Sequence, residues 1–419
     1  MRVSDFALVS FVAGSLLAGC SSPAGEPAPS DGGLAPPAVG QGLQYKMVST
    51  LVPAQETERC QMFQIAEGIA FNRSEIRYSA GSHHVLLFET SYKQFPTMDR
   101  TGKTVDPTKV HDCAEGAAGL WDVTRVVGGS QNADGANAID ALPAGVAIKL
   151  KPGSIVLMNT HYLNASTQTI TTDARVNLYA VPPESVKVEA GMLFFYNPFI
   201  HIAPQATNSA HMRCKLSADI NLINVQSHMH RRGMNYVANL IDAKGASTEL
   251  YSNSLWENVP IKRFGAGMAL KAGESLDYRC DYKNGENREV IQGFTTKDEM
   301  CMLVGPYYPR NDHLEVCETA EGDLDGAATW IGTGNVDCGQ TFKCLSNAAD
   351  APKEDQARQF YGCVVRSCPA SASQISEVLH CQISNAHGAC DGCKGSACQK
   401  CILDKCKKEI NACGAATCG

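Results

Sequence analysis

Residues 220–230 read INLINVQSHMH, an apolar and β-branched run that ends in two histidines placed two positions apart. Residues 154–164 (SIVLMNTHYLN) and 235–242 (NYVANLID) have the same strand-like character, and residues 283–287 (KNGEN) have the composition of a turn. Between residues 43 and 317, short runs of this kind alternate with Gly, Asn, Asp and Pro, and long helical periods are few. The pattern predicts an all-β fold with two successive β-sandwiches.

Two changes in composition divide the chain further. Val181-Pro182-Pro183 suits a connection, because proline cannot donate a hydrogen bond to a strand ladder. We therefore expect the sandwiches at residues 43–183 and 184–320. Residues 338–418 hold 12 of the 19 cysteines and include helix-compatible segments such as residues 354–368. We expect residues 321–419 to form a small, separate, partly helical module that disulfides rather than a large core hold together.

The cysteine content also indicates the compartment. Nineteen cysteines favour an oxidising environment, in which thiols pair into disulfides. A zinc site at the Cys390-x-x-Cys393 and Cys398-x-x-Cys401 motifs is the alternative for the tail, and the exported context favours disulfides over it. The net charge of −7 provides no basic surface for nucleic acid, so we expect no nucleic-acid partner.

The N-terminus is typical of an exported lipoprotein. An apolar stretch at residues 6–17 is too short to span a bilayer, and it leads into Leu17-Ala18-Gly19-Cys20, which resembles a bacterial lipobox. We expect a signal peptide at residues 1–19, a lipid on Cys20 and a flexible Ser-, Pro- and Gly-rich linker at residues 20–42. The lipid would anchor the protein to a bacterial membrane, with the outer membrane favoured by Ser21, facing the periplasm or the cell surface. An ordinary signal peptide is the alternative.

Five of the 11 histidines fall in three short motifs, SHHVLLF at residues 82–88, NTHY at 159–162 and SHMH at 227–230. Residues two apart in a strand point to the same face, so His228 and His230 can bind one metal ion. His83 and His84 face opposite ways in a regular strand, and joint binding by them requires a bend, a bulge or a strand end. A thioether added to imidazoles favours copper. Met300 is the candidate sulfur, and a core methionine is the alternative reading.

The order of these motifs resembles the copper type II, ascorbate-dependent monooxygenases, the family of dopamine β-monooxygenase and peptidylglycine α-hydroxylating monooxygenase. The matching residues are His83-His84, His161, His228-x-His230, Asp298-Glu299-Met300-Cys301 and Tyr307-Tyr308-Pro309. The resemblance covers roughly residues 43–317. It implies two jelly-roll-like sandwiches that face each other across a solvent-filled cleft, each with one copper ion.

The resemblance also implies a role for each ligand. His83, His84 and His161 would hold an electron-transfer copper, and His228, His230 and Met300 would hold a catalytic copper that activates O2. Ascorbate or a similar one-electron reductant would supply electrons, and a C–H bond of a small organic substrate would be hydroxylated. Three disulfides are implied as well: Cys60–Cys113, Cys214–Cys317 and Cys280–Cys301.

Substrate recognition departs from the peptide-hydroxylating branch of the family. That branch holds a peptide carboxylate with an arginine before the His-x-His motif and with an asparagine and a tyrosine after the ligand methionine. Gln226, Met302 and Val304 stand at these places here. Without an arginine to pair a carboxylate, peptidylglycine is not the expected substrate, and we expect a neutral pocket for another small molecule.

Two other functions fit parts of the sequence. A non-catalytic surface lipoprotein that binds or stores copper would need the same histidines. An adhesion or interaction protein would act through the cysteine-rich tail, for which the sequence identifies no partner.

Overall fold

The computed structural model describes residues 33–113, 116–319, 326–386, 388–393 and 396–418. The expected signal peptide and the expected lipid site at Cys20 lie outside these ranges. None of the helices in the described ranges is long and apolar enough to cross a membrane.

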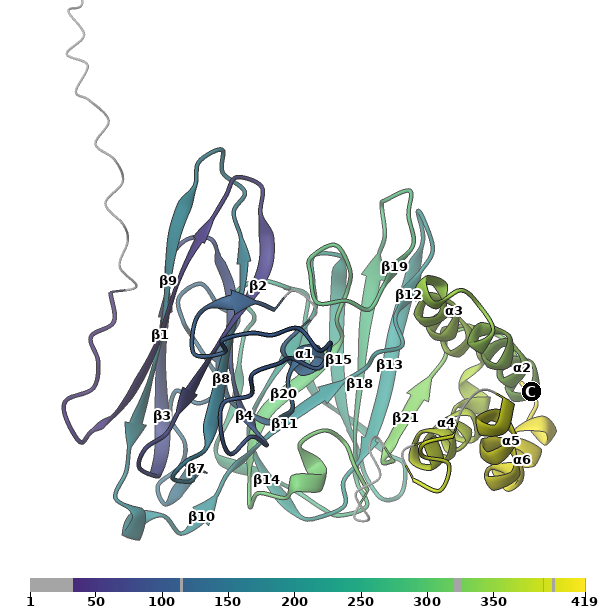
Figure 1. The fold of residues 1–419 in the computed structure, drawn as a ribbon. Coiled ribbons are helices and arrows are strands. Elements are labelled where there is room, and N and C mark those ends of the chain that lie inside the picture. The colour runs from purple at the N-terminus through teal and green to yellow at the C-terminus, as the bar shows by residue number, and fades with distance from the viewer. Residues whose placement is uncertain (1–32, 114–115, 320–325, 387, 394–395, 419) are drawn as a thin grey trace, which may run out of the picture.

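Two five-stranded sheets form the first half of the fold (Figure 1). One contains, in spatial order, β1 (Gly42–Leu51), β9 (Ile170–Ala180), β3 (Ile69–Tyr78), β7 (Val146–Leu150) and β10 (Val188–Glu189). The other contains β5 (His111–Asp112), β2 (Glu56–Gln64), β8 (Ile155–Leu163), β4 (Ser82–Thr90) and β6 (Val123–Ser130). Both sheets contribute to one hydrophobic core, to which Met47, Phe71 and Leu157 belong, so they pack as a sandwich.

The second half repeats this plan. One sheet contains β11 (Gly191–Tyr196), β20 (Met302–Tyr308), β14 (Ile220–His228) and β17 (Lys262–Leu270). The other contains β16 (Ser247–Asn253), β15 (Gly233–Ile241), β18 (Ser275–Lys283), β13 (Thr207–Lys215) and β21 (Ala328–Ile331). A short ribbon pairs β12 (His201–Ile202) with β19 (Val290–Ile291). Strand β10, which ends at Glu189, still pairs with β7 of the first half, whereas β11, which begins at Gly191, pairs with β20 of the second half. The boundary between the two halves therefore lies between Glu189 and Gly191.

Short helices complete the two halves, namely α1 (Ala117–Leu120) and the 3-10 turns η1 (Pro183–Ser185) and η2 (Asp312–Leu314). The prediction of a mostly β fold with a disulfide-rich helical C-terminus is confirmed. The jelly-roll connectivity stays a prediction.

The C-terminal tail consists of helices joined by six disulfides. The helices are α2 (Cys338–Ala349), α3 (Lys353–Val365), η3 (Pro369–Ser371), α4 (Ala372–Ala386), α5 (Ser396–Lys405) and α6 (Lys407–Ala415). The pairs are Cys338–Cys413, Cys344–Cys363, Cys368–Cys418, Cys381–Cys406, Cys390–Cys401 and Cys393–Cys398. The four cysteines of the alternative zinc motif are therefore all in disulfides.

The expectation that this tail is a separate module is wrong. Strand β21 joins the second sandwich by pairing with β13, and α4 packs against β21 (Figure 1). Ser376 Oγ on α4 accepts a hydrogen bond from Trp330 N at 3.0 Å. Buried Leu345, Val364 and Leu379 belong to the same core as the second sandwich. Apolar side chains on these helices are removed from water by the sandwich, so disulfides are not the sole support of the tail.

Alternation along the strands determines which sheets meet at the centre of the molecule. On β4, Val85 and Leu87 are fully buried in the first core, whereas Leu86 and Phe88 lie on the opposite face. Phe194 on β11 lines the same space as these two residues, and its ring centroid is 6.4 Å from that of Phe88. The sheet of β2, β8 and β4 therefore faces the sheet of β11, β20 and β14.

Replacing Leu379 by alanine tests the shared core. Leu379 is 1% exposed on α4, so we expect Leu379→Ala to lower the free energy of unfolding by about 2–5 kcal/mol in a single transition that includes the sandwich. Denaturant unfolding followed by tryptophan fluorescence measures it. Leu403→Ala is the control, because Leu403 is 45% exposed on α5. A sandwich transition that Leu379→Ala leaves unchanged would show that the tail folds by itself.

Candidate metal centres

The first three histidines come together through a bulge in β4. Ser82 pairs with Tyr162, and His84 pairs with His161, so β4 advances two residues while β8 advances one. The extra residue, His83, therefore lies in a bulge and turns to the same side as His84. Adjacent histidines can share a metal ion only if the backbone brings both side chains to one side in this way. Nitrogen atoms of His83, His84 and His161 lie within 4.8 Å of one another. These residues thus form a group with the spacing of metal ligands.

The protonation of this group suits metal binding. Burial lowers the pKa of His83 to about 4, and burial with the nearby His161 lowers the pKa of His84 well below its usual value. His161 Nε2 donates to Glu56 Oε1 at 3.0 Å, whereas His161 Nδ1 is buried and has no hydrogen-bond partner among the described residues. Neutral imidazoles with a free nitrogen are the form that binds a metal ion, and an outer carboxylate fixes the ring and its tautomer.

Glu56 stays ionised in this position. Burial raises the pKa of Glu56, but the hydrogen bonds from His161 and from the Thr296 backbone outweigh it and bring the pKa to about 2. Glu58, two residues along the same face of β2, is 4% exposed, and burial raises its pKa to about 7. Its Oε2 accepts a hydrogen bond from Asn159 Nδ2 at 2.9 Å.

The second pair of histidines lies at the end of β14. His228 is the last residue of the strand and His230 lies two residues on, while Met229 between them is buried in the second core. The two rings have centroids 5.3 Å apart. His230 Nδ1 donates to the Asp298 carbonyl at 3.0 Å, and His230 Nε2 is buried and meets no hydrogen-bond partner in the part of the chain that the structure describes. His228 Nδ1 donates to Gln131 Oε1 at 2.7 Å, so Nε2 of both rings remains for a metal ion.

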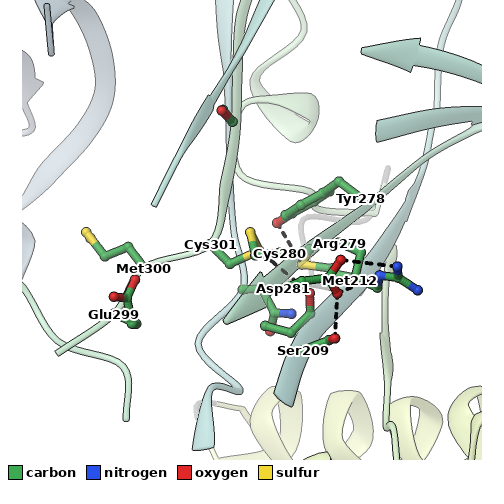
Figure 2. Close-up of a disulfide and its surroundings, with 12 residues drawn as sticks. Ser209, Met212, Tyr278, Arg279, Cys280, Asp281, Glu299, Met300 and Cys301 are labelled. Carbon is green, nitrogen blue, oxygen red and sulfur yellow. Dashed lines mark hydrogen bonds and ion pairs between the residues drawn. A yellow bond between two sulfur atoms is a disulfide. The ribbon is translucent and has the colours of Figure 1, made fainter. Parts of the chain in front are cut away.

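Met300 follows the segment that supports His230. Glu299, which is 0% exposed, accepts hydrogen bonds from the backbone N–H of His230 at 2.9 Å and of Arg232 at 2.8 Å. The Met300 carbonyl accepts from Tyr282 Oη at 2.8 Å. The Cys280–Cys301 disulfide lies immediately after Met300, and the Met300 side chain extends away from it (Figure 2). Met300 lines the same cavity as His84 and His228.

All three disulfides implied by the family resemblance are present: Cys60–Cys113, Cys214–Cys317 and Cys280–Cys301. The last of these fixes the backbone next to Met300 to strand β18.

The histidines of the two halves lie closer together than expected for ligand sets on opposite sides of a cleft, and the number of metal sites stays a prediction. The ring centroids of His84 and His228 are 5.8 Å apart, so the five histidines form one continuous cluster. The physical reason is that polar groups cross from one sandwich to the other, as Gln131 does to His228. His83 is also stacked on Trp256 of the second sandwich, with ring centroids 5.6 Å apart.

A cavity of about 470 Å³ lies beside this cluster, between the facing sheets. Its walls are largely apolar, with Leu86, Phe88, Phe194 and Phe294 among the lining residues. The three residues expected at the substrate pocket also line it, and they are Gln226, Met302 and Val304. A mostly apolar cavity with a few polar groups is typical of a small-molecule site.

Four residues near the histidines were missed by the sequence analysis: Glu56, Glu58, Gln131 and Glu299. Glu56 and Glu58 carry a weak signal, because two carboxylates on one strand face beside Cys60 are unusual for a buried strand. Glu299 lies next to Met300 in the Asp298-Glu299-Met300-Cys301 motif, which gives no sign that its side chain supports His230. Gln131 carries no signal, since its contacts lie about 95 residues away in the sequence.

Comparison with known proteins agrees with part of this picture. Residues 189–324 match the family model for the copper type II ascorbate-dependent monooxygenase, C-terminal domain. The matched segment contains His228, His230 and Met300, whereas His83, His84 and His161 precede it. None of the curated proteins gives a significant match. The family is therefore supported through the second half of the chain.

Replacing Glu56 by alanine tests its support of His161. Loss of an outer-shell partner typically costs 10- to 100-fold in metal affinity, so we expect Glu56→Ala to weaken copper binding at the first three histidines by about this factor. Competition with a chromophoric copper chelator measures the affinity. Glu67→Ala is the matched control, because Glu67 is exposed in the turn after β2. Equal affinity in Glu56→Ala and Glu67→Ala would remove the proposed role of Glu56.

Proposed function

We propose that the protein is a copper-dependent, ascorbate-driven monooxygenase that hydroxylates a C–H bond of a small organic substrate with O2. The observation that carries this proposal is the histidine cluster, with unpartnered buried nitrogens on His161 and His230, at the wall of an apolar cavity. The family match of the second half supports it. Copper, when bound, supplies the one-electron chemistry needed to activate O2.

The protein's own residues would hold and orient the ligands. His83, His84 and His161 would hold one ion. His228, His230 and Met300 would hold the other.

Fixed tautomers are the chief contribution of the surrounding residues. Gln131 and the Asp298 carbonyl both accept Nδ1–H, which directs Nε2 of His228 and His230 inward. Glu56 performs the corresponding task for His161 through Nε2, which leaves Nδ1 free. Rings held in this way need no reorganisation when a metal ion binds.

Exclusion of water is the second task. The apolar side chains of the facing sheets line the space beside His84 and His228, which protects reactive species from side reactions. Gln226, Met302 and Val304 line this space without a positive charge. Arg125 also lines the cavity, but its guanidinium is paired with Glu89 and Glu189. A neutral or weakly polar substrate fits such a pocket better than a carboxylate does.

The proposed location follows from the N-terminal sequence. A lipid on Cys20 would anchor the protein to a bacterial membrane, and the linker would hold the catalytic part away from it. The free part of the expected linker ends before Leu34, because Leu34 is 6% exposed and its carbonyl accepts a hydrogen bond from Gln44 Nε2 at 3.0 Å. Nineteen cysteines, of which 18 are in disulfides, agree with an oxidising compartment.

A non-catalytic copper-binding lipoprotein is the second candidate function. The same histidine cluster would serve it, but the apolar cavity beside the cluster is typical of a site that also binds a small organic molecule. Ascorbate-driven oxygen uptake in the presence of a library of small organic molecules separates the two. Bound copper with uptake no greater than that of free copper would favour storage.

Replacing Met300 by alanine tests the catalytic assignment. We expect Met300→Ala to fold with its disulfides intact and to retain copper at His83, His84 and His161. We expect it to lose substrate-dependent oxygen uptake by more than the 10- to 100-fold typical of an outer-shell change. Met98→Ala is the matched control, because Met98 is 55% exposed. Unchanged hydroxylation by Met300→Ala would contradict the assignment.

A further inference from the structure

A second pocket lies between the helical tail and the second sandwich. Helix α3 packs against β12 and α2 packs against α3, and the pocket is formed by these two helices and the ribbon of β12 and β19 (Figure 1). Its volume is about 560 Å³, which is within the range of small-molecule sites. Among the described residues, it shares no lining side chain with the cavity beside the histidines, and all of its lining side chains except Cys344 are polar. It is therefore a separate candidate site of different chemistry.

One side of α2 supplies much of the wall. The pocket residues on this helix are Gln340, Lys343, Cys344 and Asn347. Their spacing of three, four and seven residues from the first places them on one side of the helix. Leu345 is buried in the core that the tail shares with the second sandwich. The helix therefore turns an apolar side to the core and a polar side to the pocket.

The pocket is positively charged, although the chain has a net charge of −7. Three of its lining side chains are cations, namely Lys343, Arg358 and Arg366. Glu289 is the one carboxylate among the described lining residues. Cations gathered in a concave surface raise the local concentration of anions. The charge balance therefore favours an anionic ligand.

The carboxylate of Glu289 is already paired. Its Oε2 accepts a hydrogen bond from Arg358 Nη1 at 2.8 Å and lies 3.6 Å from His201 Nε2. Arg358 Nη2 donates to Asp355 Oδ1 at 2.9 Å. These contacts neutralise Glu289 and Arg358 and leave Lys343 and Arg366 as the excess positive charge.

Lys343 and Arg366 have donors to offer a ligand. Within the described ranges, neither side chain forms an ion pair with aspartate or glutamate. Arg366 Nη2 donates to Cys344 Sγ at 3.4 Å, and sulfur is a weak acceptor. Three amide side chains of the pocket also have no hydrogen-bond partner among the described residues, and they belong to Gln340, Asn347 and Gln359.

The walls of the pocket are fixed to one another. The disulfide between Cys344 and Cys363 joins α2 to α3. Gly362 allows α3 to approach β12 closely, because a Cβ at this position would lie 3.5 Å from the His201 ring and 3.0 Å from Arg366 Nη1. A ligand therefore meets donors whose backbone is already held in place, which lowers the entropy cost of binding.

We propose that this pocket binds a small organic anion whose phosphate or carboxylate group pairs with Lys343 and Arg366. A guanidinium group presents two parallel N–H donors that match two oxygens of either group. The volume exceeds that of the anionic group alone, so the free amides of α2 and α3 would contact the rest of a polar ligand. The ligand would touch both the tail and the sandwich. This site is additional to the proposed oxidation chemistry and does not depend on it.

Isothermal titration calorimetry of the full chain tests the proposal, with inorganic phosphate and citrate as separate probes in a chloride-containing amine buffer. We expect saturable binding of at least one probe at one site per chain, and the tighter probe distinguishes a phosphate ligand from a carboxylate ligand. In the double variant Lys343→Gln with Arg366→Gln, we expect the affinity to fall by about tenfold for each lost cation. Binding of neither probe by the wild-type protein would overturn the site.

A matched double variant controls for the overall charge. Lys353→Gln with Lys408→Gln also removes two cations, from exposed positions on α3 and α6 that do not line the pocket. We expect it to bind the anion as the wild-type protein does. Equal weakening in the two double variants would show a general attraction to the surface and would overturn the site.

Glu289→Gln changes the affinity in the opposite direction. The substitution removes the carboxylate that repels an anion and neutralises Arg358, so we expect binding to become several-fold tighter. A disturbance of the structure would weaken binding, so unchanged or weaker binding in this variant would contradict the electrostatic account. None of these titrations involves copper or oxygen uptake, and their failure would leave the proposed monooxygenase untouched.

Discussion

The Glu56 carboxylate joins the two halves of the molecule at the point where the five clustered histidines meet. The same oxygen, Oε1, accepts one hydrogen bond from His161 Nε2 and a second from the backbone N–H of Thr296, which belongs to the opposite sandwich. Because a single atom makes both contacts, the orientation of His161 and the position of the segment before Met300 are not independent. The burial of the histidines, the cavity beside them and the contact of His84 with His228 all require the halves to stay in this position.

Burial gives the cluster its chemical character. The pKa of His230 falls to about 3 through burial, and those of His84 and His228 fall well below the usual value for the same reason. The rings are therefore neutral at any physiological pH. A buried nitrogen without a partner, such as Nε2 of His230, costs roughly 1–3 kcal/mol, and a metal ion is a partner that removes this cost.

The sequence was sufficient for the parts of the structure that depend on local pattern. Strand alternation and turn residues predicted the β fold, and the spacing of His228 and His230 predicted side chains on one face, which their ring centroids 5.3 Å apart agree with. The sequence indicated that His83 and His84 can share a metal ion only at a bend, a bulge or a strand end, and the structure has a bulge at His83. Period-two alternation tells which face of a strand a residue occupies, but it does not tell which other sheet that face meets. The roles of Gln131 and Glu56 and the contact of His84 with His228 therefore could not be predicted.

The cysteine count correctly indicated disulfides in the tail, but it also led to the wrong expectation of a separate module. The sequence does not show that Leu345 and Leu379 pack into the core of the second sandwich.

The number of copper ions that the full chain binds tests the central claim most directly. Elemental analysis after dialysis against a defined concentration of free copper gives this number for the purified protein. We predict two ions per chain, with one lost when His161 is replaced by alanine and the other lost when His230 is replaced. Binding of no copper, or retention of both ions by a variant that lacks both histidines, would contradict the account.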